Sequence, residues 1–254
     1  MPTYLLTLRF DGTDFSGWQS QPNTRTVQDV LETALAELFE QGIRTAAAGR
    51  TDAGVHAECL PVSFTSGVVR DAGTVVRALN QKLPNDLAVM TARVVPDGFS
   101  ARYDAVSRSY RYQIAVGAVR DPLVRRTHWQ LPVDLSADAM DNALAALVGE
   151  HDFSSFRGAD CAAKTPVKTM VHAARRDLGA GRTALDFEAG GFLRGMVRSI
   201  VGTLVEIGRG ERPASDMAEL LARPDRAGAG RTAPAHGLFF ARANYSEWNV
   251  CDGH

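Results

Sequence analysis

The feature that most constrains the fold of this 254-residue chain is an order of periodic segments that occurs twice. In the first half, alternating apolar residues over 3–11 indicate a strand, and an apolar pattern at helical spacing follows Thr26. The remaining segments of this half are expected to be two strands, a helix and a strand, at residues 43–49, 55–65, 72–82 and 87–95. The expected order is therefore β-α-β-β-α-β.

The second half repeats this order. Its expected strands and helices are 106–116, 136–148, 167–178, 183–189, 192–208 and 237–244, with a short extra helix at 214–222. The order β-α-β-β-α-β is that of the split βαβ, or ferredoxin-like, unit. The chain is therefore predicted to be α+β, with one such domain at 1–104 and a second at 105–254.

The most informative short segment runs from Gly49 to Ala57 and reads GRTDAGVHA. Glycines on both sides of Arg50 and Asp52 predict a tight loop. A carboxylate held there beside a guanidinium stays ionised, as a nucleophile or a base requires. The alternative is that Asp52 only closes a turn and that Arg50 is its surface partner, because Asp and Gly are common turn residues.

Strand 106–116 carries aromatic and basic side chains on one face. Arg108, Tyr110 and Tyr112 alternate along it, so they share that face and form a possible platform for a nucleotide base. The alternative is that both tyrosines belong to the core of the sheet.

The predicted helix 192–208 carries two arginines, Arg194 and Arg198, four residues apart on one face of an otherwise apolar helix. An arginine beside a buried stripe requires an acidic partner, for which Asp52 is a candidate. The alternative is a solvated arginine face.

Composition restricts the class of protein. With 45% apolar and 22% charged residues the chain is typical of a soluble globular protein, and no run is long enough for a transmembrane helix. The first residues lack a secretory pattern, and Cys59, Cys161 and Cys251 are scattered, which argues against a disulfide framework and a zinc site. We therefore expect a reduced, cytoplasmic protein.

Cofactor and metal sites are not expected. The chain has no P-loop and no GxGxxG segment, and the spacing of His56, His151 and His236 matches no metal site, so His56 is interpreted as a loop or strand-edge residue. The net charge of −1 does not indicate a nucleic-acid partner. However, 25 of the 28 basic residues are arginine, which suits phosphate contacts and base stacking, although an arginine-rich genome explains this equally well.

Taken together, these segments resemble the tRNA pseudouridine synthase A family over nearly the whole chain. The matching segments are Phe10–Thr13, Gly17–Pro22, Arg25–Gln28, Gly49–Ala57, Asn80 with Leu83–Pro84, Phe99–Arg102, Arg108–Tyr112, Gly149–Phe156, Met196–Arg198 and Ala233–Leu238. The chain departs from the family pattern at Gly190, where an asparagine is expected, and at Gly195, where a larger polar residue is common.

This resemblance implies the pseudouridine synthase fold, with two ferredoxin-like domains that face a central RNA-binding cleft. It also implies a homodimer that binds tRNA without a metal or cofactor and converts uridine to pseudouridine at positions 38, 39 and 40 of the anticodon stem-loop. In this family pattern Asp52 is the catalytic aspartate, Tyr110 packs on the target base, and Arg198 pairs with Asp52. Arg50 occupies the space left by the flipped base, and Leu238 lines the apolar floor.

Two other functions remain as alternatives. A non-catalytic RNA-binding or RNA-folding module that uses the same cleft would not require Asp52. A hydrolase acting on a glycosidic bond would normally need a second carboxylate as proton donor, and no paired acid stands out in the sequence.

Overall fold

The structure is a computed structural model, and it describes residues 1–246 and residue 250. It divides into two compact units. Unit 1 consists of residues 1–108 together with the residues of the last strand from Phe239 onward, and unit 2 consists of residues 109–238. The last strand is thus grouped with unit 1, whereas it is expected from the sequence in the second of two domains. The division into two ferredoxin-like domains at residue 104 stays a prediction.

Unit 1 has the predicted order of elements. These are β1 (Thr3–Phe10), α1 (Val27–Phe39), β2 (Ala46–Ala47), β3 (His56–Thr65), α2 (Ala72–Lys82) and β4 (Leu87–Val95). The strands lie in the order β4-β1-β3-β10, with β2 also paired to β3. β1 is antiparallel to both of its neighbours, whereas β10 (Leu238–Tyr245) is parallel to β3. The predicted β-α-β-β-α-β order is confirmed in this half.

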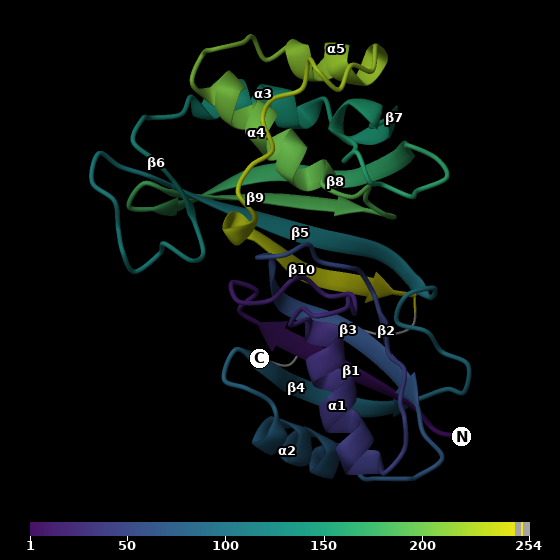
Figure 1. Cartoon of the computed structure of the whole chain (residues 1–254). Coiled ribbons are helices and arrows are strands. Elements are labelled where there is room, and N and C mark those ends of the chain that lie inside the picture. Colours follow the sequence, from purple (N-terminus) through teal and green to yellow (C-terminus); the bar gives the residue numbers. More distant parts are fainter. Residues whose placement is uncertain (247–249, 251–254) are drawn as a thin grey trace. The chain divides into compact units, whose positions relative to one another are not determined.

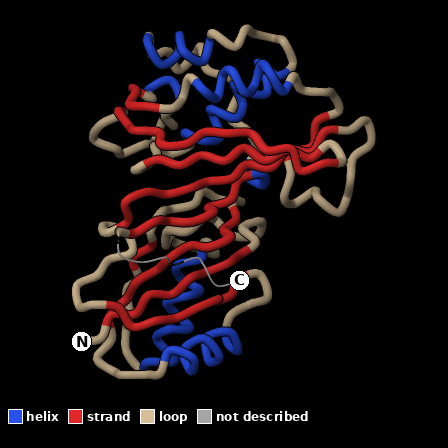
Figure 2. The backbone as a smooth tube through the Cα atoms, turned by 180° about the vertical axis from the view of Figure 1, so that it is seen from behind, coloured by secondary structure: helices blue, strands red, loops and turns tan. Residues whose placement is uncertain are grey.

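The core of unit 1 forms between this sheet and its helices. α1 and α2 lie on the same face of the sheet (Figure 1, and from behind in Figure 2). Tyr4 of β1 stacks on Phe64 of β3 with ring centroids 5.1 Å apart and meets Phe39 of α1 edge-on at 5.5 Å. α1 begins where the sequence predicts, because the Thr26 hydroxyl accepts the Asp29 N–H at 3.2 Å as an N-cap.

Unit 2 contains most of the second set of elements. The strands are β5 (Ala105–Val116, which begins in unit 1), β6 (Trp129–Leu131), β7 (Gly149–Asp152), β8 (Val167–Gly179) and β9 (Arg182–Ala189). The helices are α3 (Ala137–Ala145), α4 (Met196–Gly208), α5 (Asp216–Ala222) and the short 3₁₀ helices η1 (Ser154–Phe156) and η2 (Ala235–Gly237). The strand order is β5-β9-β8-β7, with β6 paired to β5. α3 and α4 pack together, with α5 outside them (Figure 1).

Two features of unit 2 differ from the sequence-based expectation. The short strands β6 and β7 were not predicted, because three or four residues give no measurable alternation. The helix predicted from residue 192 begins only at Met196, because Gly195 has a φ of +72°, which a right-handed helix excludes. Arg194 therefore precedes α4, and the prediction that it shares a helix face with Arg198 is wrong.

The cysteines also differ from expectation. Cys59 is disulfide-bonded, so the expectation of a fully reduced protein, drawn from the scattered cysteines, is wrong, whereas Cys161 is a free thiol. Within the described part of the chain, no helix combines the length and apolarity needed to cross a membrane.

Candidate active site

The loop between β2 and β3 carries Asp52 in a tight turn. The Val55 N–H donates to the Asp52 carbonyl oxygen at 3.1 Å, and Gly54, the third residue of the turn, has a φ of +77°. Ala53 before it does not have a positive φ, so the turn is of type II, which requires glycine at its third position. The Asp52 side chain is half-buried and the Arg50 side chain is exposed.

A second segment, residues 12–18, holds this turn from one side. The Trp18 N–H donates to the Thr51 carbonyl oxygen at 3.0 Å, and the Gly54 N–H donates to the Phe15 carbonyl oxygen at 3.3 Å. Gly17 makes the close approach possible, because a Cβ there would lie 2.6 Å from the Thr51 carbonyl oxygen and 3.1 Å from the Asp52 carbonyl carbon. The backbone on which Asp52 sits is therefore fixed by contacts that leave no room for a side chain.

Arg25 holds residues 12–18 in place. Its guanidinium makes two hydrogen bonds to Asp86, both 2.8 Å long, and lies 4.0 Å from the ring centroid of Phe15. The Ser16 N–H also donates to the Arg25 carbonyl oxygen at 2.8 Å. Hydrogen bonding to Asp86 raises the pKa of Arg25, so the guanidinium stays charged.

Arg108 fixes the chain that leads into Arg50. Its Nε donates to the Ala48 carbonyl oxygen at 3.0 Å, and its two terminal nitrogens donate to the carbonyl oxygens of Ala105 and Arg102. From the sequence, Arg108 is expected to be a cation beside Tyr110 on a base-binding face. In the structure its guanidinium instead donates hydrogen bonds to three backbone carbonyl oxygens, and one of these belongs to Ala48, two residues before Arg50.

Unit 2 contains Tyr110 and its packing partner. The Tyr110 side chain on β5 is 9% exposed, and its ring meets Phe192 nearly edge-on, at 80° and 4.9 Å between centroids. Tyr112, two residues later, is completely buried and donates its hydroxyl to the Pro234 carbonyl oxygen at 2.8 Å. Burial raises the pKa of Tyr112, so this hydroxyl stays protonated. Tyr112 is therefore a core aromatic, as the alternative interpretation has it.

The segment that follows α5 contacts Arg198 and leads to Leu238. Arg198 Nε donates to the Ala233 carbonyl oxygen at 2.7 Å, and the Ala233 N–H donates back to the Arg198 carbonyl oxygen at 3.0 Å. The segment crosses α4 closely at Gly202, where a Cβ would lie 1.7 Å from the Arg231 carbonyl oxygen. It then continues through η2 to Leu238, the buried first residue of β10.

The expected site residues thus fall into two groups. Arg50 and Asp52 lie in one loop of unit 1, while Tyr110, Arg198 and Leu238 lie in unit 2. Sequence reasoning missed the supporting residues that make long-range contacts, because nothing in the local pattern shows which carbonyls a side chain such as Arg108 will reach. The described residues contain no group of three or more His, Cys, Asp or Glu side chains arranged to hold a metal ion.

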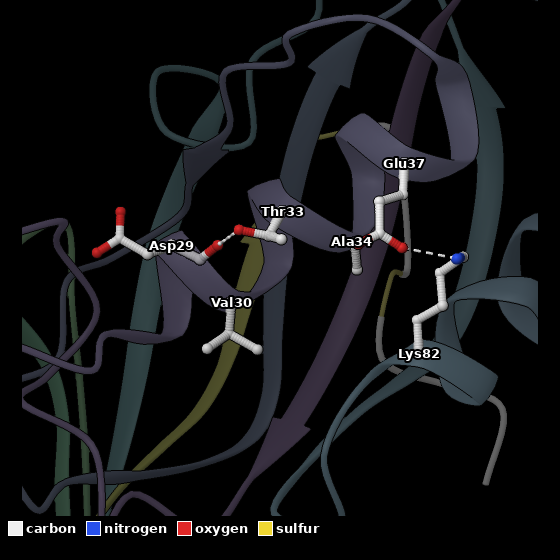
Figure 3. A pocket seen from close by; sticks show the side chains of 6 residues that line it. All are labelled: Asp29, Val30, Thr33, Ala34, Glu37 and Lys82. Atoms are coloured by element: carbon white, nitrogen blue, oxygen red, sulfur yellow. Dashed lines mark hydrogen bonds and ion pairs between the residues drawn. The ribbon is translucent and has the colours of Figure 1, made fainter.

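A surface depression of about 290 Å³ in unit 1 does not contain any of these residues. It is lined by one face of α1 and by Lys82 at the end of α2, whose Nζ lies 2.7 Å from a Glu37 carboxylate oxygen (Figure 3). This ion pair joins α1 and α2 at one side of the depression. We assign it to helix packing.

Comparison with known proteins identifies the family. Residues 7–104 and 143–246 match the family described as tRNA pseudouridine synthase. The chain is 42% identical over 247 residues to the tRNA pseudouridine synthase A of Myxococcus xanthus, covering 97% of this chain and 93% of that protein. It is 45% identical over 251 residues to the tRNA pseudouridine synthase A of Ralstonia nicotianae, covering 97% and 91%.

A solved structure is also similar, but more weakly. A chain of a Cbf5-Nop10-Gar1 complex aligns over 93% of this chain and 57% of its own length, with 10% identity and a TM-score of 0.38. A similarity at this level carries no argument.

The family match extends over both halves of the chain and includes the turn with Asp52 as well as the segments around Arg198 and Leu238. Tyr110 lies outside the two matched family segments but within the span covered by the relatives' near-complete alignments. The sequence-based expectations of the family and of an isomerase that acts on tRNA are confirmed. This chain belongs to the tRNA pseudouridine synthase family.

Proposed function

We propose that this protein isomerises uridine to pseudouridine at positions 38, 39 and 40 of the tRNA anticodon stem-loop, with Asp52 as the nucleophile or base. The observation that carries the proposal is the turn that holds Asp52. Its backbone is fixed on one side by residues 12–18, and its carboxylate is half-buried. A carboxylate in a rigid, partly closed position is what attack on a sugar or base requires.

The reaction defines what the site must do. The bond from C1′ to N1 of uracil breaks, the base rotates, and a bond from C1′ to C5 forms while the C5 proton is lost and N1 gains one. The atoms of the nucleotide are otherwise unchanged, so the reaction needs no oxidant or reductant. A stacked base hides this bond, so the nucleotide must leave the helix, which costs a few kcal/mol.

Asp52 has three possible routes in this chemistry. It attacks C1′, adds to C6 of the base, or removes a proton from the sugar to start an elimination. Each route requires an ionised carboxylate beside the reacting nucleotide.

The other site residues have roles in binding the nucleotide. We propose that Arg50, exposed and two residues before Asp52, occupies the space that the flipped base leaves. Tyr110 packs on the flipped base, supported by the edge of Phe192, and Leu238 provides the apolar floor. The pairing of Arg198 with Asp52 that the family resemblance implies stays a prediction.

Assembly and location complete the proposal. We infer a cytoplasmic homodimer that takes tRNA as its partner and needs no cofactor. A purely RNA-binding module is the weaker alternative, because the chain belongs to a family of isomerases. Light scattering of the purified protein tests the dimer directly.

The experiment that tests this function maps pseudouridine in a tRNA with uridine at all three positions. The tRNA is incubated with the protein, treated with a carbodiimide that marks pseudouridine, and read by primer extension. We expect stops at 38, 39 and 40 with the wild-type protein and none with Asp52→Asn. Stops only at other positions, or equal stops with Asp52→Asn, would contradict the proposal.

The binding roles are tested with the same assay at saturating tRNA. We expect Arg50→Ala and Leu238→Ala to lower the rate at all three positions, because both act on the flipped nucleotide. Tyr110→Phe keeps the ring that stacks on the base, so a full rate in this variant restricts Tyr110 to packing, and a reduced rate assigns a role to its hydroxyl.

A further inference from the structure

His56 is the first residue of β3, four positions after Asp52. Its side chain is 2% exposed, although sequence reasoning assigned it only to a loop or a strand edge. One face of its ring is covered by Phe239 of β10, with centroids 4.7 Å apart and 23° between the planes. β3 and β10 are neighbouring strands in unit 1 (Figure 1). A buried, stacked imidazole so close to the Asp52 turn calls for a partner at its nitrogens.

That partner is the segment which holds the turn. The Gly12 N–H donates to His56 Nδ1 at 3.0 Å. Gly12 itself lies directly on the turn, because a Cβ there would be 2.0 Å from the Val55 carbonyl oxygen. Residues 12–18 are thus held at both ends. At the first end, Gly12 donates to His56, and at the last end, the Trp18 N–H donates to the Thr51 carbonyl oxygen.

This link, unlike the backbone bonds beside it, depends on a proton. Nδ1 accepts the Gly12 N–H only with its lone pair free, that is, in the neutral tautomer that carries its proton on Nε2. A carboxylate oxygen of Asp11 lies 3.2 Å from the same nitrogen. That oxygen also accepts from the Thr13 N–H at 3.0 Å and from the Thr13 hydroxyl at 2.6 Å, so Asp11 is held in place.

One nitrogen therefore has two partners that suit opposite protonation states. A neutral ring with its proton on Nε2 accepts from Gly12, whereas a protonated ring donates to Asp11 and has no lone pair left for Gly12. Phe239 covers the ring face and offers no hydrogen-bonding group to either nitrogen.

We propose that His56 is a positioning residue for Asp52: its neutral imidazole fastens Gly12 against the turn, and protonation of Nδ1 transfers the ring to Asp11 and releases that end. This inference rests on the proposed function of Asp52. Activity is then highest with a neutral ring and falls as acidification protonates it. The loss appears in kcat rather than in KM, because the loop that moves carries the reacting carboxylate.

Two variants separate the hydrogen bond from the titration. His56→Asn keeps an acceptor, Oδ1, attached to Cγ as Nδ1 is in histidine, but it does not titrate between pH 5 and pH 8. His56→Leu removes the acceptor and keeps a buried side chain of similar size. kcat and KM for tRNA are measured for both variants and for the wild type over this pH range, with thermal unfolding as the control for folding.

We expect the wild type to lose kcat at low pH and His56→Asn to keep a flat profile through the same range. His56→Leu should have a kcat lower by about ten- to a hundredfold at every pH, with KM within about twofold, because a displacement on the order of 1 Å at a reacting group has effects of this size. The proposal would be overturned by a wild type whose kcat does not fall at low pH. It would also be overturned if the fall persists in His56→Asn, or if His56→Leu keeps full kcat.

A second measurement uses only the wild-type protein and so does not depend on the folding of a variant. The amide proton of Gly12 is followed by NMR from pH 8 to pH 5, and its chemical shift should move with the same midpoint as kcat. A Gly12 amide that does not shift over this range contradicts the proposal. Asp52→Asn, assayed alongside, separates the two hypotheses: if it is active the proposed function fails, and if it is inactive while the kcat of His56→Asn still falls at low pH, only the role of His56 fails.

Discussion

Replacing Gly17 by alanine tests whether the backbone contact under Asp52 sets its position. Gly17 has a φ of +89°, and an added Cβ would lie 2.6 Å from the Thr51 carbonyl oxygen. The turn would have to retreat by about 0.8 Å to reach the 3.4 Å at which ordinary contact begins. Since a displacement on the order of 1 Å at a reacting group lowers rates by about a hundredfold, we expect kcat to fall by about ten- to a hundredfold.

The chain offers a matched control for this change. Gly98, in the loop after β4, has a φ of +86°, and an added Cβ would find no atom within 4 Å. Gly98→Ala therefore places an alanine at nearly the same positive φ as Gly17→Ala, which costs about 1–2 kcal/mol, but without the contact. We expect Gly98→Ala to lose this amount of stability and keep its kcat, and Gly17→Ala to lose about 1–3 kcal/mol more.

The assay combines two measurements on each variant. Urea unfolding gives the free energy of unfolding, and tritium release from tRNA labelled at uridine C5 gives kcat. If Gly17→Ala has a kcat within about twofold of that of Gly98→Ala, Asp52 does not depend on this contact, and the reasoning is refuted.

Three further predictions concern the supports of the two units. Asn80→Ala should lower the free energy of unfolding by about 2 kcal/mol, because the Asn80 side chain bonds both the N–H and the carbonyl oxygen of Val89; a loss under about 0.5 kcal/mol in urea would contradict this. Asp86→Asn should cost about 1 kcal/mol in the same assay, since the pair with Arg25 is bidentate but partly exposed, and added salt should shrink the difference from wild type; an unchanged difference in 1 M salt counts against the pair. Burial lowers the pKa of His128, so the unfolded chain binds the extra proton first and stability should decrease as pH falls below about 6.5. His128→Gln should weaken that decrease, and identical pH profiles of unfolding for the two proteins would show that His128 does not contribute.

Sequence patterns were sufficient for elements with strong periodicity and local start signals. The bounds of α2 and β4 match the prediction because Asp71 caps the helix and both segments have clear periods. Gly195 shows where such reasoning fails: the apolar pattern continues through residue 192, but the positive φ of one glycine stops the helix at Met196. The spacing of apolar residues does not reveal the backbone φ of an individual glycine.

The candidate site was predictable in its short motif and not in its supports. Asp52 stands out because glycines and an arginine surround it in nine residues. His56 belongs to the same nine residues, yet its partner, Gly12, is 44 positions away. Arg108 likewise reaches the Ala48 carbonyl oxygen over 60 positions. Contacts of this kind depend on which distant elements the fold brings together, which a single sequence does not encode locally.

The most direct test of the central claim is the single-turnover rate of tritium release by Asp52→Asn at saturating tRNA. Its matched control is Asp97→Asn, the same chemical change at a carboxylate that is 76% exposed on the loop after β4. We expect the rate of Asp52→Asn to fall at least about a thousandfold below that of Asp97→Asn, because removal of a nucleophile or base eliminates the chemical step. A rate within about tenfold of the control would contradict the assignment of Asp52 as the reacting group.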